Sequence, residues 1–252
     1  MLQQKQFKIL LIGDSCIDEY VYGTCTRLNP EAPVPVLQYT RTEKKPGMAR
    51  NVFENLKAFS VDIEFITNKE EIVKRRYIDE KYNHQILRVD YETNLSPLKT
   101  KIFSNGYDAI VISDYNKGFL SKEKIYKIVK DSKCPVFIDS KKTDLHLPNK
   151  KNCYVKINDI EYKKLTKKIN NIILTKGGNG AEYNGKLYEA EKVNVFDVVG
   201  AGDTFLSTLV YFYLICGTIE NAILYANKAA AIAVSHPGTY VLTKKDVKHL
   251  CN

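Results

Sequence analysis

The sequence predicts an α/β fold, in which a doubly wound, mostly parallel sheet is flanked by helices and carries a small β-sheet lid. Four apolar runs after residue 108 each end in a polar or glycine-rich cluster, which indicates parallel strands with a site along one edge. Two hairpin-like segments, at about 20–45 and 72–91, indicate the lid strands. A chain of 252 residues suits one large domain, so we expect a single domain over 1–252.

The first half of the chain begins with a buried strand and continues into hairpin material. Residues 7–12 are apolar apart from Lys8 and stop at Gly13, as in a strand that is covered on both faces. Three prolines at 30, 33 and 35 exclude a helix from 22–45. Residues 46–59 predict an amphipathic helix with Val52, Leu56 and Phe59 on one face. A short strand at 61–67 leads into the second hairpin.

The second half alternates between strand and helix. Strands are predicted at 109–113, 135–139, 154–157 and 171–175, with helices at 121–130 and from 158 onward. Asn184-Gly185 predicts a type I′ turn in a hairpin at 181–190. A helix over 204–216 should end at Gly217, and a second one should run from Thr218 to Val234.

The stretch from Asp197 to Thr204 is where we expect the chemistry. Gly200 and Gly202 allow a tight turn and close approach of a ligand, because neither carries a Cβ. The N–H groups of residues 200–203 should point off a helix N-terminus, where a phosphate is favoured. Asp203 has two interpretations there: it caps the helix, or it is a base aimed at a hydroxyl that attacks a phosphate.

Composition argues against several classes of protein. The net charge of +9 comes from 38 basic and 29 acidic residues, but lysine is spread over the whole chain, so we expect no nucleic-acid partner. Six cysteines form no C-x-x-C pair, which favours reduced thiols. The longest apolar run, 205–216, is too short to span a membrane, and no signal peptide is visible. We therefore expect a cytoplasmic protein without a membrane partner.

Charged residues early in the chain are candidates for holding a polar substrate. Asp14 and Asp18 follow the first strand and could bind the hydroxyls of a polyol, although Asp14 is also a common turn residue. Gly47 and Asn51 stand at a helix start, where a substrate can approach the backbone. The cations of the second hairpin either form a solvated strand face or bind a substrate phosphate; they are Lys74, Arg75, Arg76, Lys81 and Arg88.

Several of these blocks resemble the ribokinase-like (PfkB) carbohydrate kinases. Asp197-Val-Val-Gly-Ala-Gly-Asp-Thr resembles the C-terminal signature of that family, and Asn158-x-x-Glu161 matches its N-x-x-E motif. Within the family, five blocks most resemble the kinases of D-glycero-D-manno-heptose 7-phosphate. They are residues 13–20, 30–36, 87–90, 113–118 and 138–144. The resemblance extends from about residue 7 to 245 and implies transfer of the ATP γ-phosphate to O1 of that heptose, giving the 1,7-bisphosphate.

The resemblance also implies roles for individual residues. Asp203 would be the catalytic base, and the amides of Gly200, Ala201 and Gly202 would form an anion hole. Residues implied in substrate binding are Asp14, Asp18, Gly47, Asn51, Lys74, Arg76, Arg88, Asp114 and Lys117. Those implied in ATP binding are Asn158, Lys176, Gly178, Gly180 and Asn227. Glu161 and Asn158 would hold Mg²⁺ through water, a monovalent cation such as K⁺ is a further expected cofactor, and a homodimer would form through the lid strands.

The sequence departs from the family pattern in three places. Met48 stands where a second glycine is usual, and Arg50 where a small residue is usual. The connections at 67–72 and 161–171 are too short for the elements that relatives carry there. No nucleotidyltransferase domain, which some heptose kinases carry, is expected in this chain. Two alternatives therefore stay open: a kinase of another sugar or nucleoside, and a catalytically weakened homologue that binds sugar or nucleotide.

Overall fold

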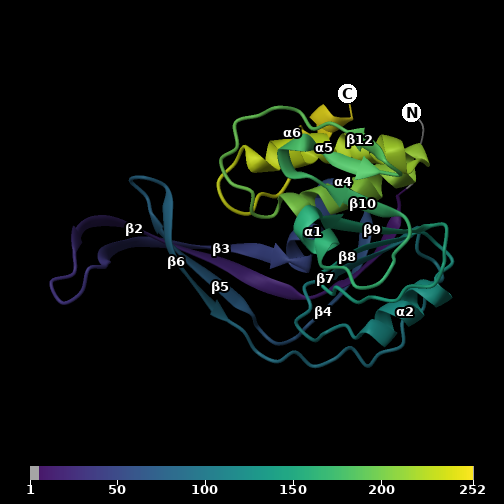
Figure 1. Ribbon diagram of the computed structural model, residues 1–252, viewed down its shortest axis with the longest axis horizontal. Coiled ribbons are helices and arrows are strands. Elements are labelled where there is room, and N and C mark those ends of the chain that lie inside the picture. Colours follow the sequence, from purple (N-terminus) through teal and green to yellow (C-terminus); the bar gives the residue numbers. More distant parts are fainter. Residues whose placement is uncertain (1–5, 252) are drawn as a thin grey trace.

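The computed structural model describes residues 6–251, which form two sheets (Figure 1). The larger sheet has eight strands in the order β12-β11-β10-β9-β8-β7-β1-β4. Its six parallel strands are β1 (Lys8–Gly13), β4 (Asp62–Thr67), β7 (Ala109–Asp114), β8 (Val136–Ser140), β9 (Cys153–Asn158) and β10 (Ile172–Thr175). An antiparallel hairpin of β11 (Ala181–Tyr183) and β12 (Lys186–Tyr188) completes one edge. Asn184 and Gly185 both have positive φ, which confirms the predicted turn.

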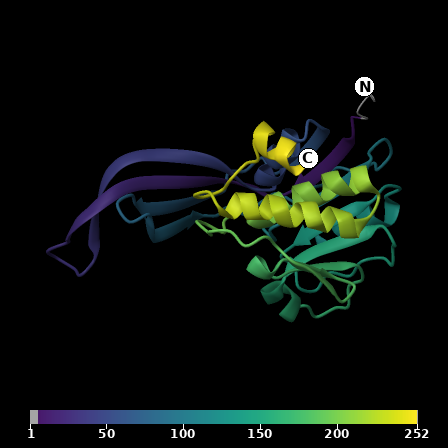
Figure 2. The ribbon, with the colours of Figure 1, turned by 90° about the horizontal axis from the view of Figure 1, so that it is seen from above.

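The smaller sheet stands off the larger one and projects from the body of the molecule (Figures 1 and 2). Its order is β3-β2-β5-β6, with β2 at Ser15–Leu28, β3 at Pro35–Met48, β5 at Val73–Asp79 and β6 at His84–Tyr91. The two early hairpins are joined by parallel pairing of β2 with β5, which was not predicted. The predicted fold class, with its mostly parallel main sheet and second small sheet, is confirmed.

Helices cover both faces of the larger sheet. One layer contains α1 (Ala49–Ala58), α4 (Ala201–Cys216) and α5 (Ile219–Val234), with α6 (Lys244–Leu250) packed on α5. Figure 2 shows α4 and α5 running side by side across this face. The opposite face carries α2 (Lys122–Asp131), while the short α3 (Asp159–Lys163) and a single 3₁₀ turn (Gly177–Asn179) follow β9 and β10. α6 was not predicted; it begins with a capping box of Thr243 and Asp246.

Alternate residues of the central strands enter two separate cores. Ile9 and Leu11 of β1 pack in the core under α1, α4 and α5, whereas Leu10 and Ile12 pack in the core under α2. This alternation follows from the two-residue period of a strand, and it explains why the central strands are apolar throughout. The predicted apolar face of α1 is confirmed, since Val52, Leu56 and Phe59 are all buried.

Two local features follow from the departures in sequence. α1 starts after Met48, whose φ of 58° and ψ of −135° lie in a region that favours glycine. The shortened connections run from β4 to β5 and from α3 to β10 without an intervening helix. Within residues 6–251, no helix combines the length and hydrophobicity that crossing a membrane requires.

Candidate active site

The centre of the candidate site is Asp203, the third residue of α4. Its side chain is 4% exposed, and the N-cap position is held instead by Gly200 in a left-handed conformation with φ 80°. Asn51 Nδ2 donates to one carboxylate oxygen of Asp203 at 3.1 Å, and the Tyr115 hydroxyl donates to the other at 2.7 Å. The capping interpretation of Asp203 is therefore wrong, because this carboxylate points to side chains and not to the free amides of its helix.

The surroundings of Asp203 make it an unusual acid. Burial raises the pKa of Asp203 to about 6, against the lowering effect of the hydrogen bonds from Tyr115 and Asn51. Asn55 fixes the orientation of Asn51, because Asn55 Nδ2 donates to Asn51 Oδ1 at 3.0 Å. The carboxylate is therefore ionised at neutral pH yet close enough to its pKa to take up a proton.

Two of the four expected free amides are free in the structure. The N–H groups of Gly200 and Gly202 have no acceptor within residues 6–251. In contrast, Ala201 N donates to Val198 O at 3.3 Å and Asp203 N donates to Gly200 O at 3.0 Å. The expectation that all four amides of residues 200–203 point at a ligand is therefore wrong. Only the two glycine amides are free, and the amides of Ala201 and Asp203 donate to carbonyls of the turn.

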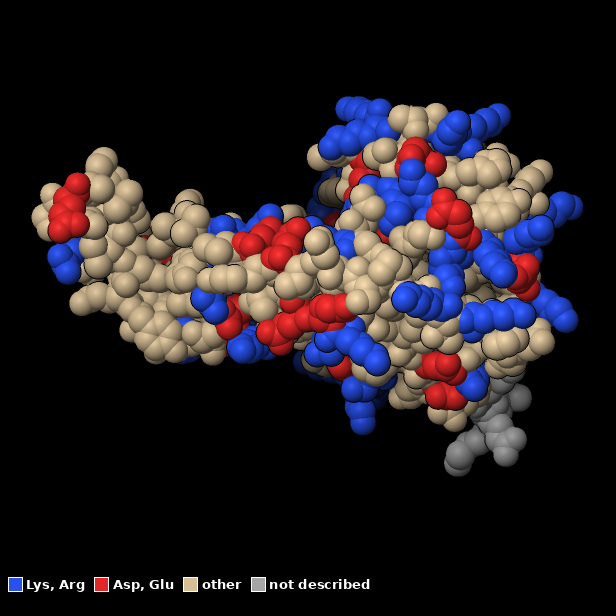
Figure 3. Space-filling model, turned by 90° about the horizontal axis from the view of Figure 1, so that it is seen from below, with Lys and Arg blue, Asp and Glu red and all other residues tan. Residues whose placement is uncertain are grey.

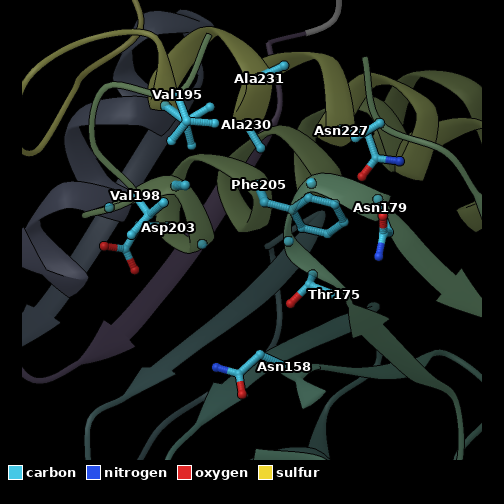
Figure 4. Close-up of a pocket in the computed structure, with 18 of the residues that line it drawn as sticks. Asn158, Thr175, Asn179, Val195, Val198, Asp203, Phe205, Asn227, Ala230 and Ala231 are labelled. Atoms are coloured by element: carbon cyan, nitrogen blue, oxygen red, sulfur yellow. The ribbon is translucent and has the colours of Figure 1, made fainter. Parts of the chain in front are cut away.

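A cavity of about 550 Å³ opens in front of these glycines (Figure 4). Figure 4 shows Asp203 at one side of it, Asn227 and Asn179 at the other, and the apolar residues Val195 and Ala230 along the top. Most residues that were expected to bind ATP line this cavity, namely Asn158, Gly178, Gly180 and Asn227. Lys176 does not line it, since its ammonium is ion-paired with Glu182 at 2.6 Å. The cavity volume falls in the range that is usual for cofactor-sized ligands.

A charged wall of the cavity was missed by the sequence analysis. Lys156 Nζ donates to Asp139 Oδ2 at 2.6 Å, and Lys141 Nζ contacts both Asp139 and Glu161. Burial alone would raise the pKa of Asp139, but the two lysines outweigh it and leave that pKa below its usual value. Lys156 Nζ also lies 2.8 Å from the place where a Cβ on Gly202 would stand. The signal in the sequence was the position of Asp139 and Lys156 at the carboxyl ends of adjacent strands.

The N-x-x-E motif has a structural role in this chain. The Asn158 side chain accepts from Glu161 N at 2.9 Å, and Glu161 accepts from Asn158 N at 3.0 Å, which closes a capping box on α3. Within residues 6–251, no group of three or more metal-binding side chains is present. However, the carboxylates of Asp139 and Glu161 lie close enough to share the Lys141 ammonium. Both carboxylates already accept hydrogen bonds here, Asp139 from Lys141 and Lys156 and Glu161 from Lys141 and the Asn158 backbone amide, so a Mg²⁺ ion between them would take the place of the Lys141 ammonium.

On the expected acceptor side, one incompletely bonded acid follows the first strand. Asp14 is fully buried, and its Oδ2 accepts from Lys117 N at 3.1 Å, whereas its Oδ1 has no partner among the described residues. Burial raises the pKa of Asp14. A buried oxygen without a donor is the state expected of a group that accepts a bond from a ligand hydroxyl. Asn51 is also fully buried, between this region and Asp203.

The second acid, Asp18, is already paired. Arg76 Nη1 donates to Asp18 Oδ1 at 2.6 Å and Thr239 Oγ1 donates to Oδ2 at 3.2 Å, with both charged side chains buried. Gly47 makes room for this carboxylate, because a Cβ there would lie 2.4 Å from Asp18 Oδ2. In this structure Arg76 contacts an acid of the neighbouring strand, and its expected contact with a substrate phosphate stays a prediction.

Lys74, Arg76 and Arg88, the cations of the smaller sheet that were expected to bind the substrate phosphate, share one face of it. Asp18 pairs with Lys74 in register, Tyr20 with Arg76, and Arg76 with Arg88, so these side chains project to the same side. Lys74 is half-buried and, within the described part of the chain, forms no ion pair. Arg88 is half-exposed and pairs with Asp90 at 2.9 Å. Lys74 is therefore the most available of the cations that were expected to hold a phosphate.

Two other expected substrate residues have structural contacts. Asp114 is fully buried, and its oxygens accept from Lys142 at 2.8 Å and from Ser140, so we no longer regard it as a substrate ligand. Lys117 positions Asp14 through its backbone N–H, while its ammonium is paired with Glu92. Figure 3 shows that basic and acidic residues are interspersed over the face it presents, without a continuous basic surface.

Comparisons with known proteins agree with this geometry. Residues 146–246 match the model of the pfkB family carbohydrate kinases. The chain is 29% identical to the bifunctional protein HldE of a Nitratiruptor species, over 96% of this chain and 64% of the relative. It is 30% identical to HldE of Haemophilus influenzae (strain PittEE), over 97% and 63%. The chain thus spans less than two thirds of the length of these relatives. The first alignment covers 296 positions, more than the chain has residues, so the relative carries segments that this chain lacks.

Solved structures show the same fold. The ribokinase of Thermotoga maritima has a TM-score of 0.69 at 15% identity, over 97% of this chain and 99% of that one. The ribokinase of Cryptococcus neoformans var. grubii serotype A in complex with ADP has a TM-score of 0.66 at 15% identity, with the same coverage. The chain thus has a ribokinase-like fold, matches the pfkB family carbohydrate kinase model over residues 146–246, and is similar to HldE proteins over nearly its whole length.

Proposed function

We propose that this chain transfers the γ-phosphate of ATP to O1 of D-glycero-D-manno-heptose 7-phosphate. The observation that carries the proposal is the position of Asp203, a buried carboxylate that stands between the cavity and Asn51 on the acceptor side. The blocks shared with heptose phosphate kinases and the similarity to HldE proteins favour that acceptor. The product would be the 1,7-bisphosphate, with ADP as the second product.

In the proposed reaction Asp203 takes the proton from the attacking hydroxyl. The hydroxyl oxygen then bonds to the γ-phosphorus, and the bond from that phosphorus to the β–γ bridging oxygen breaks. The N–H groups of Gly200 and Gly202 and the ammonium of Lys156 stand where they stabilise the negative charge of the transferred group. Glu161, Asn158 and Asp139 would hold Mg²⁺ through water, and the ion would neutralise phosphate charge when it is bound with the nucleotide.

The two ends of the cavity suit the two ends of a nucleotide. Its apolar wall suits a purine base, and contains Val193, Val195, Ala230, Ala231 and Val234. Its charged wall, formed by Lys141, Lys156 and the α4 N-terminus, suits phosphates. Gly180 is required where it lies, because its φ is 98° and a Cβ would lie 2.1 Å from Tyr188 O. A further requirement for a monovalent cation such as K⁺ stays a prediction, and assays in which tetramethylammonium replaces K⁺ would test it.

On the acceptor side, Asp14 Oδ1 would accept a sugar hydroxyl and Lys74 would face the distal phosphate. The test is ADP release with ATP and Mg²⁺ against a panel of sugars. Turnover should be fastest with heptose 7-phosphate and much slower with unphosphorylated ribose or fructose. Equal activity on the plain sugars would refute the heptose assignment, and turnover confined to a nucleoside would establish the alternative kinase.

Two observations favour a second candidate, a homologue that binds sugar or nucleotide without turnover. Arg76 neutralises Asp18 in a buried pair, and Met48 occupies a backbone conformation that favours glycine, so the acceptor pocket differs from the family pattern. In that case ATP with Mg²⁺, or the phosphosugar, would raise the melting temperature while no ADP is released with any sugar of the panel. Release of ADP that depends on the sugar would exclude this candidate.

A further inference from the structure

Tyr115 has no role in the reaction as described so far, yet its hydroxyl touches the proposed base. It follows β7 directly, and the next residue, Asn116, turns the chain with a φ of 59°. Its hydroxyl donates to Asp203 Oδ1 at 2.7 Å, and its side chain lines the cavity. Two residues later, Lys117 N holds Asp14, so this one loop contacts both the base and an acid of the acceptor side.

The ring of Tyr115 also contacts two lysines from different parts of the fold. Lys74 Nζ of the smaller sheet lies 5.4 Å from the ring centroid, and Lys141 Nζ of the cavity wall lies 5.4 Å from the same centroid. Such distances are those of cation–π contacts. Lys74 is the cation we assign to the acceptor phosphate, while Lys141 belongs to the nucleotide side. The Tyr115 ring therefore lies between the lysine assigned to the acceptor phosphate and the lysine of the nucleotide side.

We propose that Tyr115 is a positioning residue for phosphoryl transfer: its hydroxyl orients and stabilises the charged Asp203 carboxylate, and its ring holds Lys74 and Lys141 at two separate phosphate positions. The inference rests on the function proposed above and adds to it a residue of the acceptor side. In this proposal one side chain both aligns the Asp203 carboxylate and keeps the Lys74 and Lys141 ammonium groups apart.

The electrostatics of Asp203 give this proposal a measurable consequence. Groups from five elements interact with the carboxylate: Asn51 of α1, Tyr115 after β7, Asp139 of β8, Lys156 of β9 and the Cys16 thiol of β2. Hydrogen bonds from Tyr115 and Asn51 lower the pKa of Asp203, as does the charge of Lys156, whereas burial and Asp139 raise it. Removing the Tyr115 hydroxyl should therefore raise that pKa further, by about one unit.

The experiment compares Tyr115→Phe with wild type in the full chain. The acid limb of kcat should move to higher pH by about one unit, so that activity on this limb falls about tenfold while the plateau changes less. The same displacement should occur in the pH titration of the Asp203 carboxyl, followed by ¹³C NMR without substrate and assigned with Asp203→Asn. Tyr154→Phe is the matched control, since it removes a part-buried hydroxyl that contacts Tyr213 and not Asp203.

Each outcome supports or overturns the proposal. An unchanged titration of Asp203 in Tyr115→Phe, with only a lower melting temperature, would mean a structural role and overturn it. If Tyr115→Phe folds poorly, Tyr115→Leu takes its place in the experiment. It also lacks the hydroxyl, so the pKa of Asp203 should rise in the same way. If the NMR shift occurs but no sugar gives turnover, the proposed function fails while the contact to Asp203 stands. If Asp203→Asn is inactive and Tyr115→Phe keeps the wild-type titration, only the Tyr115 inference fails.

Discussion

Asp203 combines properties that an acid chosen for stability alone would not have. It is 4% exposed, and its pKa of about 6 lies above the value of 3.8 for a free side chain. The folded chain therefore binds a proton at this carboxyl more tightly than the unfolded chain does. The stabilisation that comes with the bound proton is fully present below pH 4 and is lost as pH rises through 6. At neutral pH the charged carboxylate lowers the stability of the fold, as functional groups often do.

Asp203→Asn should therefore stabilise the folded chain above pH 6. We expect a gain of about 2 kcal/mol at pH 8 and little change at pH 4, because only at the higher pH does the wild type carry the buried charge. Chemical denaturation of both proteins at the two pH values measures this difference. A variant that is less stable than wild type at pH 8 would contradict the raised pKa.

Lys156 should matter for the rate, and Lys142 only for folding. Both lysines are buried and paired with a buried aspartate, but only Lys156 lines the cavity. Lys156→Met should lower kcat by about a hundredfold, because a charge facing the transferred group is lost. Lys142→Met should lower the free energy of unfolding by about 3–5 kcal/mol, while the folded fraction keeps its kcat. Steady-state kinetics with active-site titration separate the two effects, and equal kcat losses would refute the distinction.

At the scale of elements, the start of α1 carries the clearest conflict between sequence and backbone. Met48 has a φ of 58°, yet its side chain is buried at 3% exposure beside Cys16 and Ile72. The packing of the side chain offsets a backbone cost of about 1–3 kcal/mol. This explains how a methionine can occupy a backbone conformation that favours glycine.

Comparing Met48→Gly with Met48→Ala separates the two contributions. Both variants lose the packing of the side chain, but only glycine relieves the backbone, so Met48→Gly should be the more stable by about 1 kcal/mol. At a helix position with negative φ, the alanine variant would instead be the more stable of the two. Urea denaturation measures the difference, and an alanine variant at least as stable as the glycine variant would show that Met48 is unstrained.

Most elements were predictable, because each depended on a local pattern. Apolar runs ending in glycine or acid identified the parallel strands, and Gly217 identified the end of α4. The parallel pairing of β2 with β5 was not predictable, since it joins residues far apart in the chain and no local pattern specifies it. The same limit applies to the site: Asp203 follows from its motif, whereas the contacts of Tyr115, Asp139 and Lys156 depend on which strands become neighbours.

At the scale of the whole molecule, the projecting sheet exposes several large apolar and aromatic side chains. They include Leu28, Tyr39, Tyr82, Leu87 and Tyr91. Apolar surface gathered on one projecting element is typical of a protein–protein contact. We therefore keep the expected homodimer through the lid strands as a prediction.

Leu87→Lys should shift the chain from dimer to monomer, because it places a charge in the proposed contact. Sedimentation velocity at micromolar concentration measures the change. Leu224→Lys is the control, since Leu224 is comparably exposed but lies on α5, away from the smaller sheet. A wild-type protein that sediments as a monomer, or equal behaviour of the two variants, would contradict a dimer through this sheet.

One measurement addresses phosphoryl transfer by Asp203 most directly: single-turnover release of ADP by wild type and by Asp203→Asn, with ATP, Mg²⁺ and heptose 7-phosphate at saturation. We predict sugar-dependent release by the wild type that falls as pH is lowered through about 6, in line with the pKa of Asp203. We predict a loss of at least a thousandfold in the variant, roughly the cost of removing an essential catalytic group, with its binding of ATP retained. Sugar-dependent release by Asp203→Asn at a rate close to that of wild type would contradict the assignment of this carboxylate as the base.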